Sequence, residues 1–350
     1  MTAQQNQVIR GRLRSRSTLL TLLVASVAVF IISLSIGPTK ISPDEVLRLL
    51  VGRLFGSYPA SESTELIIFQ IRLPRVIAGA AVGASLSVAG VAFQGVFRNS
   101  MADPYVLGVS SGAAIGAALS IVIGARIGVP LLGDIPLLAF IGALLTILTV
   151  YNVARVGSRV PVTNLLLSGI AFSIFLSAVV ALLEVFAGSE LHALVFWMIG
   201  GFSYVELRDL LIIMPFAALG IGIIYLYSRD LNILQLGEEE ARHLGVETEK
   251  TKKILIVVGS LATASAVSIS GIIGFVGLVI PHITRLIVGP DHRTLTPASM
   301  LFGAIFIMLC DSFGRTVLAP IDLPVGIVTA LSGGPFFIYL LRKKKGSYET

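Results

Sequence analysis

Between Val76 and Phe97 the chain reads VIAGAAVGASLSVAGVAFQGVF, an apolar stretch with no charged residue that is rich in glycine, alanine and serine. A helix of about 20 apolar residues is long enough to cross the hydrocarbon core of a bilayer. Small residues along one helix allow its neighbours to approach closely. The stretch therefore predicts a membrane-spanning helix that packs tightly against other helices.

The composition of the whole chain agrees with that stretch. Of the 350 residues, 55% are apolar and 13% are charged, and the mean hydropathy is +0.91. A soluble domain carries about 25% charged residues. The composition excludes a soluble globular enzyme, a disordered protein and a fibrous repeat. We interpret the net charge of +6 as a sign of membrane topology rather than of nucleic-acid binding.

Apolar segments recur along the chain and predict an all-α integral membrane protein with about ten transmembrane helices. The segments are Leu19–Ile36, Val76–Phe97, Val106–Gly124, Ile135–Val153, Val162–Phe186, Leu210–Tyr227, Ile254–Ser270, Ile272–Val288, Pro297–Cys310 and Leu323–Leu341. The first is longer than the signal-peptide core of about 7–15 residues and has no cleavage pattern after it, so we expect it to be retained. The boundaries near Gly271 and in the short ninth segment are the least sharply defined.

Lysine and arginine residues predict the orientation of these spans. Basic residues gather at both ends of the chain: Arg10, Arg12, Arg14, Arg16, Arg342, Lys343, Lys344 and Lys345. Because cytoplasmic segments are enriched in basic residues, both termini are expected to be cytoplasmic. We expect residues 1–17 to form an N-terminal tail, residues 18–342 a single transmembrane domain and residues 343–350 a C-terminal tail.

A short amphipathic helix is expected between the first two spans. Ser42 is its N-cap, Pro43 takes the first helical position, and Glu45 completes a capping box. Its apolar face is formed by Val46, Leu49, Leu50 and Leu54. We expect this helix to lie on the outer membrane surface or on the outer ends of the spans.

The longest polar stretch, residues 229–253, is expected on the cytoplasmic side. Between Leu236 and Gly245, two glycines bracket a short and strongly charged helical turn. A solvated loop needs no such regularity. The turn is therefore interpreted as a docking element for another protein.

The sequence contains no motif for chemistry within the chain. It has no G-x-x-x-x-G-K-[ST] phosphate loop, no H-E-x-x-H zinc motif, no nucleophile elbow and no Cys/His cluster. Cys310, the single cysteine, is interpreted as a small core residue. We therefore expect no catalytic residue, no bound metal and no enzymatic activity.

Charge is also scarce at the expected membrane midplane. A proton-coupled carrier usually holds ionisable residues there, whereas Glu184 and Asp311 fall near the outer ends of their spans. This pattern favours a mildly polar path that another subunit drives. The candidates to line the path are Ser85, Ser87, Gln94, Ser268 and Ser270. Close helix packing is an equal alternative for these residues.

Three arginines mark the expected outer face. Arg72 and Arg75 flank Leu73 and Pro74 at the start of the second span, and Arg315 lies at the outer end of the ninth. Arginines at helix ends often extend toward water. A cluster of guanidinium groups can instead pair with carboxylates of a docking partner, and both interpretations stay open at this point.

Several motifs, taken in order, resemble the permease subunit of iron-siderophore, haem and cobalamin ABC importers, the FecCD type. They are Arg72–Arg75 (RLPR), Val82–Ala84 (VGA), Ala89–Gln94 (AGVAFQ), Asn99–Pro104 (NSMADP), Leu107–Gly112 (LGVSSG), Gly274–His282 (GFVGLVIPH), Arg285, Asp291–Arg293 (DHR), Leu323–Gly326 (LPVG) and Gly334–Phe337 (GPFF). The resemblance covers residues 19–342, and Ser100 departs from the proline often found there.

The resemblance implies a type II importer permease in the bacterial cytoplasmic membrane, paired with a second copy or a paralogous permease. It also implies a cytoplasmic ABC ATPase dimer, which uses ATP and Mg, and an extracytoplasmic substrate-binding protein. Arg72, Arg75 and Arg315 match arginines that dock the binding protein. The residues that match the ATPase-coupling helix are Leu236, Gly237, Glu238, Glu239, Ala241, Arg242, Leu244 and Gly245.

The implied substrate is a bulky metal chelate. A ferric siderophore is expected because it is the commonest substrate of the family, and cobalamin and haem are the alternatives. A secondary transporter with inverted repeats is less favoured, because the midplane lacks charge. A short echo between Ser87–Gly90 and Ser268–Gly271 is nevertheless consistent with an inverted internal repeat.

Overall fold

In the computed structural model the chain is described over residues 3–56, 61–124, 134–157, 159–203 and 205–345. In chain order the helices are α1 (Ala3–Ser35), α2 (Pro43–Phe55), α3 (Glu62–Leu66), η1 (Ile67–Arg72), α4 (Leu73–Val96), η2 (Pro104–Leu107), α5 (Val109–Leu119), η3 (Ser120–Gly124), α7 (Ile135–Ala154), α8 (Val162–Ala187), η5 (Gly188–Glu190), α9 (Leu191–Ile199), α10 (Leu207–Leu226), α11 (Ser228–Leu234), α12 (Glu238–His243), α13 (Thr248–Ser270), α14 (Val276–Val288), α15 (His292–Val317) and α16 (Val325–Lys345).

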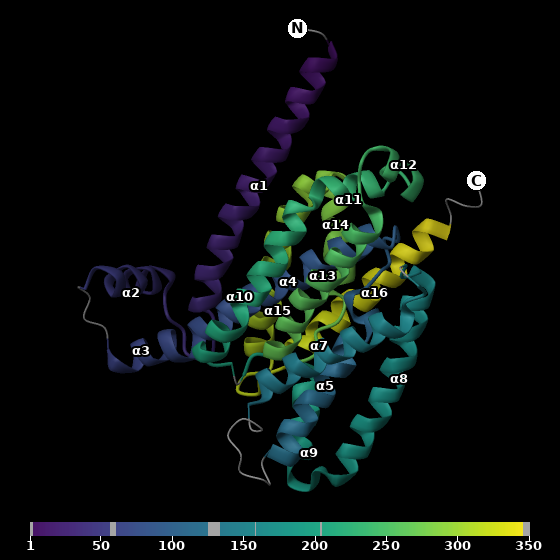
Figure 1. The fold of residues 1–350 in the computed structure, drawn as a ribbon. Coiled ribbons are helices and arrows are strands. Elements are labelled where there is room, and N and C mark those ends of the chain that lie inside the picture. The colour runs from purple at the N-terminus through teal and green to yellow at the C-terminus, as the bar shows by residue number, and fades with distance from the viewer. Residues whose placement is uncertain (1–2, 57–60, 125–133, 158, 204, 346–350) are drawn as a thin grey trace.

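The described helices gather into one bundle, from which α1 leans away while α2 and α3 project sideways (Figure 1). Seven helical stretches are long and apolar enough to cross a membrane, and three shorter apolar helices accompany them: Val109–Gly124, Val276–Val288 and Val325–Leu340. Together they coincide with the predicted spans, and no strand is present among the described residues. The prediction of an all-α membrane protein is therefore confirmed.

The stretch of small residues from Val76 onward forms most of α4, which lies at the centre of the bundle. Its apolar window is 78% buried, as is that of α13, whereas the window in the stretch Val162–Ile199, which contains α8, is only 17% buried. α15, α13, α14 and α10 all pack against α4. The small side chains of α4 allow this number of neighbours because they let helix backbones come close.

Two glycine pairs fix the closest contacts of α4. A Cβ atom added at Gly83 would overlap the carbonyl oxygen of Gly303 on α15. A Cβ atom added at Gly90 would likewise overlap the carbonyl oxygen of Gly277 on α14. The backbones touch at both points, so neither position of α4 has room for a side chain.

The predicted eighth span begins later than the sequence indicated. α13 ends at Ser270, residues 271–275 are non-helical, and α14 begins at Val276 rather than Ile272. Gly271 adopts a φ of 66° and Phe275 a φ of 70°, both in the left-handed region, which ends one helix and delays the next. The hydroxyl of Tyr105 donates to Ile273 O at 3.0 Å and accepts from Ile273 N at 3.3 Å.

The predicted ninth span, Pro297–Cys310, was too short. α15 runs from His292 to Val317 and includes Asp311 and Arg315, which are 1% and 4% exposed. A prediction from hydropathy ends a span at the first charged residue. Here Asp311 and Arg315 pair with each other inside the protein, so the helix continues past them.

The helix predicted between the first two spans is present as α2. The Ser42 side chain accepts from Glu45 N at 3.2 Å, as an N-cap does, and Pro43 is the first helical residue. Val46 and Leu49 are 0% and 2% exposed and pack with α1 residues. The structure thus places α2 against the end of α1.

The glycine contacts predict a strong effect from a single methyl group. Gly90→Ala should lower the free energy of unfolding by about 1–3 kcal/mol because the added Cβ has no space. Gly222→Ala on α10 is the matched control, because nothing lies within 4 Å of its added Cβ. Thermal unfolding of both variants in detergent checks this, and equal midpoints would contradict the close contact.

Candidate functional site

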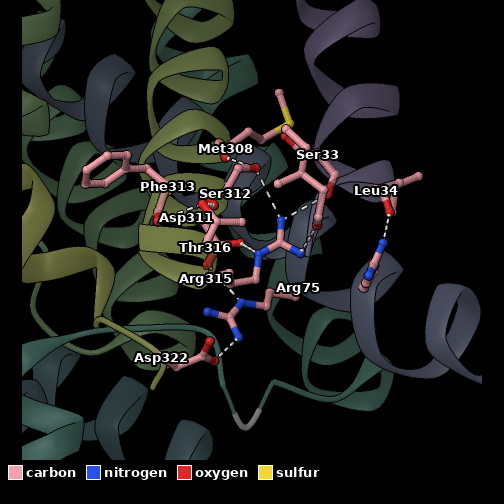
Figure 2. A network of polar contacts seen from close by, with 12 residues as sticks. Ser33, Leu34, Arg75, Met308, Asp311, Ser312, Phe313, Arg315, Thr316 and Asp322 are labelled. Carbon is pink, nitrogen blue, oxygen red and sulfur yellow. Dashed lines mark hydrogen bonds and ion pairs between the residues drawn. The ribbon is translucent and has the colours of Figure 1, made fainter. Parts of the chain in front are cut away.

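Two of the three predicted outer arginines, Arg75 and Arg315, meet two aspartates where α4 begins and α15 ends (Figure 2). Arg75 Nε donates to Asp311 Oδ1 at 2.8 Å, and Arg75 Nη1 donates to Asp322 Oδ2 at 2.7 Å. Arg315 Nε forms an ion pair with Asp311 Oδ2 at 3.0 Å. We call Arg72, Arg75, Asp311, Arg315 and Asp322 the outer arginine network. It joins α4, α15 and the connection to α16.

Two members of this network also bind the C-terminal end of α1. Arg72 Nη1 donates to Leu34 O at 2.7 Å and to Ser35 O at 3.0 Å. Arg315 Nη2 donates to Ser33 O at 3.0 Å, and its Nη1 donates to Ile36 O at 3.1 Å. The last carbonyls of a helix have no partner within the helix and carry a partial negative charge. The guanidinium groups supply both the donors and the opposite charge.

The burial of these arginines bears on the docking role predicted for them. Arg72, Arg75 and Arg315 are 4%, 8% and 4% exposed, so their heads face protein groups and do not extend to water. Docking of a binding protein stays a prediction. Since charge reversal here would break the network as well as any docking contact, a docking test needs a separate measure of folding. Sequence reasoning missed Asp311 and Asp322 as partners because no local spacing connects them to Arg75.

The predicted path residues fall into two groups. Ser268 and Ser270 line a cavity of about 500 Å³ together with His192, Trp197 and Asp209. These residues come from α9, α10 and α13, and we call this space the outer cavity. Its lining is otherwise mostly apolar, and its size falls in the range that holds a small ligand.

The other predicted path residues, on α4, lie in helix contacts rather than in the outer cavity. Gln94 Nε2 donates to Leu278 O on α14 at 3.1 Å. A Cβ atom added at Gly303 on α15 would overlap Ser87 Oγ, and Ser85 is 1% exposed. These three residues make helix contacts in this protomer, and a role for them in the path stays a prediction.

The predicted coupling turn, Leu236–Gly245, contains α12. Gly237 and Gly245 have φ values of 134° and 85°, which glycine adopts without strain. Leu236 and Leu244 are 61% and 57% exposed, whereas Ala241 is fully buried. The turn thus presents two apolar side chains at the surface while its centre is anchored.

Ion pairs hold the coupling turn on the first turn of α13. Lys252 Nζ donates to Glu238 Oε1 at 3.0 Å and pairs with Glu249 Oε1 at 2.7 Å. Arg242 Nε donates to Thr248 Oγ1 at 3.2 Å. Glu239, by contrast, is exposed. Among the predicted coupling residues, Glu238 and Arg242 therefore hold the turn on α13. Leu236, Glu239 and Leu244 are exposed at the surface.

Comparisons with known proteins fit this architecture. A family model described as the FecCD transport family matches residues 22–343. The chain is 44% identical to the cobalamin import system permease protein BtuC of Halobacterium salinarum, covering 81% of this chain and 75% of that protein. It is 39% identical to the hemin transport system permease protein HmuU of Yersinia pestis, covering 80% of this chain and 84% of that protein.

A solved structure and another relative extend the likeness. The structure is described as an inward-facing conformation of a metal-chelate type ABC transporter. It superposes with a TM-score of 0.81 and 33% identity, covering 94% of this chain and 99% of that chain. A probable iron chelatin transport system permease protein of Helicobacter pylori is 40% identical, covering 81% of this chain and 85% of that protein.

The outer arginine network predicts a large stability effect at Asp311. Asp311→Asn should cost about 3–5 kcal/mol, because it removes the carboxylate that pairs with both buried guanidinium groups and leaves Arg75 only its contact with Asp322. The matched control is Asp44→Asn in the pair Asp44–Arg48, whose side chains are 70% and 59% exposed and whose loss should cost at most about 1 kcal/mol. Thermal unfolding in detergent measures both, and similar losses would refute a buried network.

Proposed function

Because the chain belongs to the FecCD transport family, we propose that it carries a ferric siderophore across the cytoplasmic membrane as the permease subunit of an ABC importer. The observation that carries the proposal is the family match over residues 22–343, nearly the whole chain. The chain is a multi-pass protein of the bacterial inner membrane and a permease of the metal-chelate importer class. The identity of the chelate is the finer part of the proposal.

Cobalamin is the second candidate substrate, and one observation favours it. The relative at 44% identity is named a cobalamin import permease. Other relatives are named for haem and for an iron chelatin. All these cargoes are bulky chelates of a metal, which a mostly uncharged interior would hold only loosely. A ferric siderophore stays our first choice because it is the commonest cargo of the family.

The energy for transport is proposed to come from a partner. A cytoplasmic ABC ATPase dimer would bind and hydrolyse ATP with Mg, and this chain would hold no cofactor of its own. The coupling turn supports the proposal because Leu236 and Leu244 are exposed beside the charged α12. Apolar side chains surrounded by charge are typical of a surface that another protein covers.

Two further partners complete the proposed importer. An extracytoplasmic binding protein would deliver the chelate and supply most of the affinity, and Arg72, Arg75 and Arg315 remain candidates for its docking. A second copy or a paralogous permease would pair with this chain. The pairing is supported by apolar side chains of α8 that are 62–78% exposed, more than a packed bundle leaves open: Leu167, Ile174, Phe175 and Val185. Lipid would cover the remaining apolar surface.

The substrate assignment predicts a specific competition pattern. Cells that express the chain with its ATPase and binding protein should take up labelled ferric siderophore, and an excess of unlabelled ferric siderophore should suppress that uptake. Haem and cyanocobalamin should not compete. If the cells take up cyanocobalamin but neither of the other two chelates, cobalamin is the substrate instead. A complex that imports none of the three chelates in the presence of ATP would contradict the importer proposal itself.

The exposed side chains of the coupling turn predict a variant that binds the ATPase less tightly but still folds. Leu244→Ser should weaken association with the ATPase about tenfold, because it removes an exposed apolar contact from the docking surface. Its fold should be unaffected, since the side chain is 57% exposed. Val156→Ser is the control, because Val156 is 60% exposed but lies outside the turn. Co-purification with the ATPase measures the effect, and equal yields for the two variants would refute the docking role.

A further inference from the structure

α11 connects the coupling turn to the core of the bundle. It ends at Leu234, directly before the turn begins. Leu231 and Leu234 are 0% and 3% exposed, and Leu231 packs so closely on Gly95 of α4 that an added Cβ there would lie 2.6 Å from its Cδ2 atom. A displacement of the turn would therefore act on α11 as well as on α13, to which Lys252 holds it, and through α11 on the packed helices.

The side chain of Asn232 on α11 holds the first turn of α15. Its Oδ1 accepts from His292 N at 2.8 Å and lies 2.8 Å from His292 Nδ1. Its Nδ2 donates to Asp291 Oδ1 at 2.6 Å. Asp291 is itself the N-cap of α15 and accepts from Arg293 N. One amide group thus contacts both the cap and the first residue of the helix.

A second contact ties the same region to α4. Gln235 Nε2 donates to Gly95 O at 3.0 Å, near the end of α4. α4 and α15 are already in backbone contact at Gly83 and Gly303, and the ion pair between Arg75 and Asp311 joins them again at the other end. The two helices are therefore fastened to each other along their length and fastened to α11 at one end.

We propose that Asn232 is a positioning residue that links the coupling turn to the α4–α15 pair. Its amide makes α11 and the first turn of α15 move together. α15 has 26 residues and so spans about 39 Å at 1.5 Å per residue. It carries the displacement to the outer arginine network at its far end. This inference rests on the proposed function and adds to it a route between the ATPase side and the opposite face.

The contacts of Asn232 and Gln235 are polar and partly open to water, unlike those of a residue in the hydrophobic core. Asn232 is only half-buried and Gln235 is exposed, so their hydrogen bonds compete with water and add little to net stability. A break at this point should therefore uncouple motion without unfolding the chain. The Asp291–Arg293 motif, which the sequence resemblance singled out, gains a role as the receiving end of the link.

The test exchanges the two side chains that share the shortest of these hydrogen bonds. Asn232→Asp places a carboxylate against Asp291 and removes the donor between them. Adding Asp291→Asn removes that contact between like charges and returns an amide donor to the pair, and asparagine is as favourable an N-cap residue as aspartate. Asn152→Asp, on an exposed asparagine of α7, is the control for added charge.

The complex of the chain with its ATPase, in vesicles supplied with the binding protein, is assayed for uptake and for ATP hydrolysis. The probes are a ferric siderophore, haem and cyanocobalamin, each tested on the wild type. Asn232→Asp should lower uptake per ATP hydrolysed about tenfold without changing the yield or thermal midpoint of the complex. The double variant should return it to within about twofold of the wild type, and Asn152→Asp should leave it unchanged.

The outcomes separate this inference from the proposed function. Normal uptake per ATP in Asn232→Asp would overturn the link, as would a double variant that stays as uncoupled as the single one. Either result would leave the importer assignment intact, since the wild type still transports. A wild-type complex without ATP-dependent uptake of any of the three chelates would overturn both.

Discussion

The carboxylate of Asp311 is buried between the guanidinium groups of Arg75 and Arg315, and the end of the bundle where α4 begins and α15 ends is arranged around it. An isolated charge in such a place would be very costly, and its two partners would be equally costly without it. Because the partners come from α4 and α15, the network joins the first turn of α4 to the last turns of α15. Through Arg72 and Arg315 the same network completes the last turn of α1, so three helices depend on one set of charges.

Most of the helices could be predicted from the sequence, because a helix that crosses the bilayer needs about 20 consecutive apolar residues. The segments that became α7, α8 and α16 were predicted within a few residues of their bounds. The errors fell where a helix departs from that rule. α15 carries paired charges that ended the apolar run too early at Cys310, and α14 is delayed by a break that leaves the hydropathy unchanged.

The candidate sites were predicted less completely because their residues meet only in three dimensions. Arg75 and Asp311 are 236 positions apart, and Gln94 and Leu278 are 184 apart. The sequence identified the arginines as important but assigned them to an outside partner, whereas their nearest partners belong to the same chain. It located the short helix of the coupling turn because that turn is local, whereas its coupling role stays a prediction. The contact between Asn232 and His292 joins residues 60 positions apart, and no local sequence pattern indicates it.

The Tyr105 hydroxyl bonds to both backbone groups of Ile273. This contact bears on where water can bind inside the bundle. A helix break within a bundle leaves peptide groups that a water molecule would otherwise satisfy. Water at such breaks can join into a chain along which protons hop. Here a phenol fixed to the backbone takes that place, and its single proton is already donated. The phenol therefore leaves no backbone group of Ile273 for a water molecule to bind, which removes one link from any such chain.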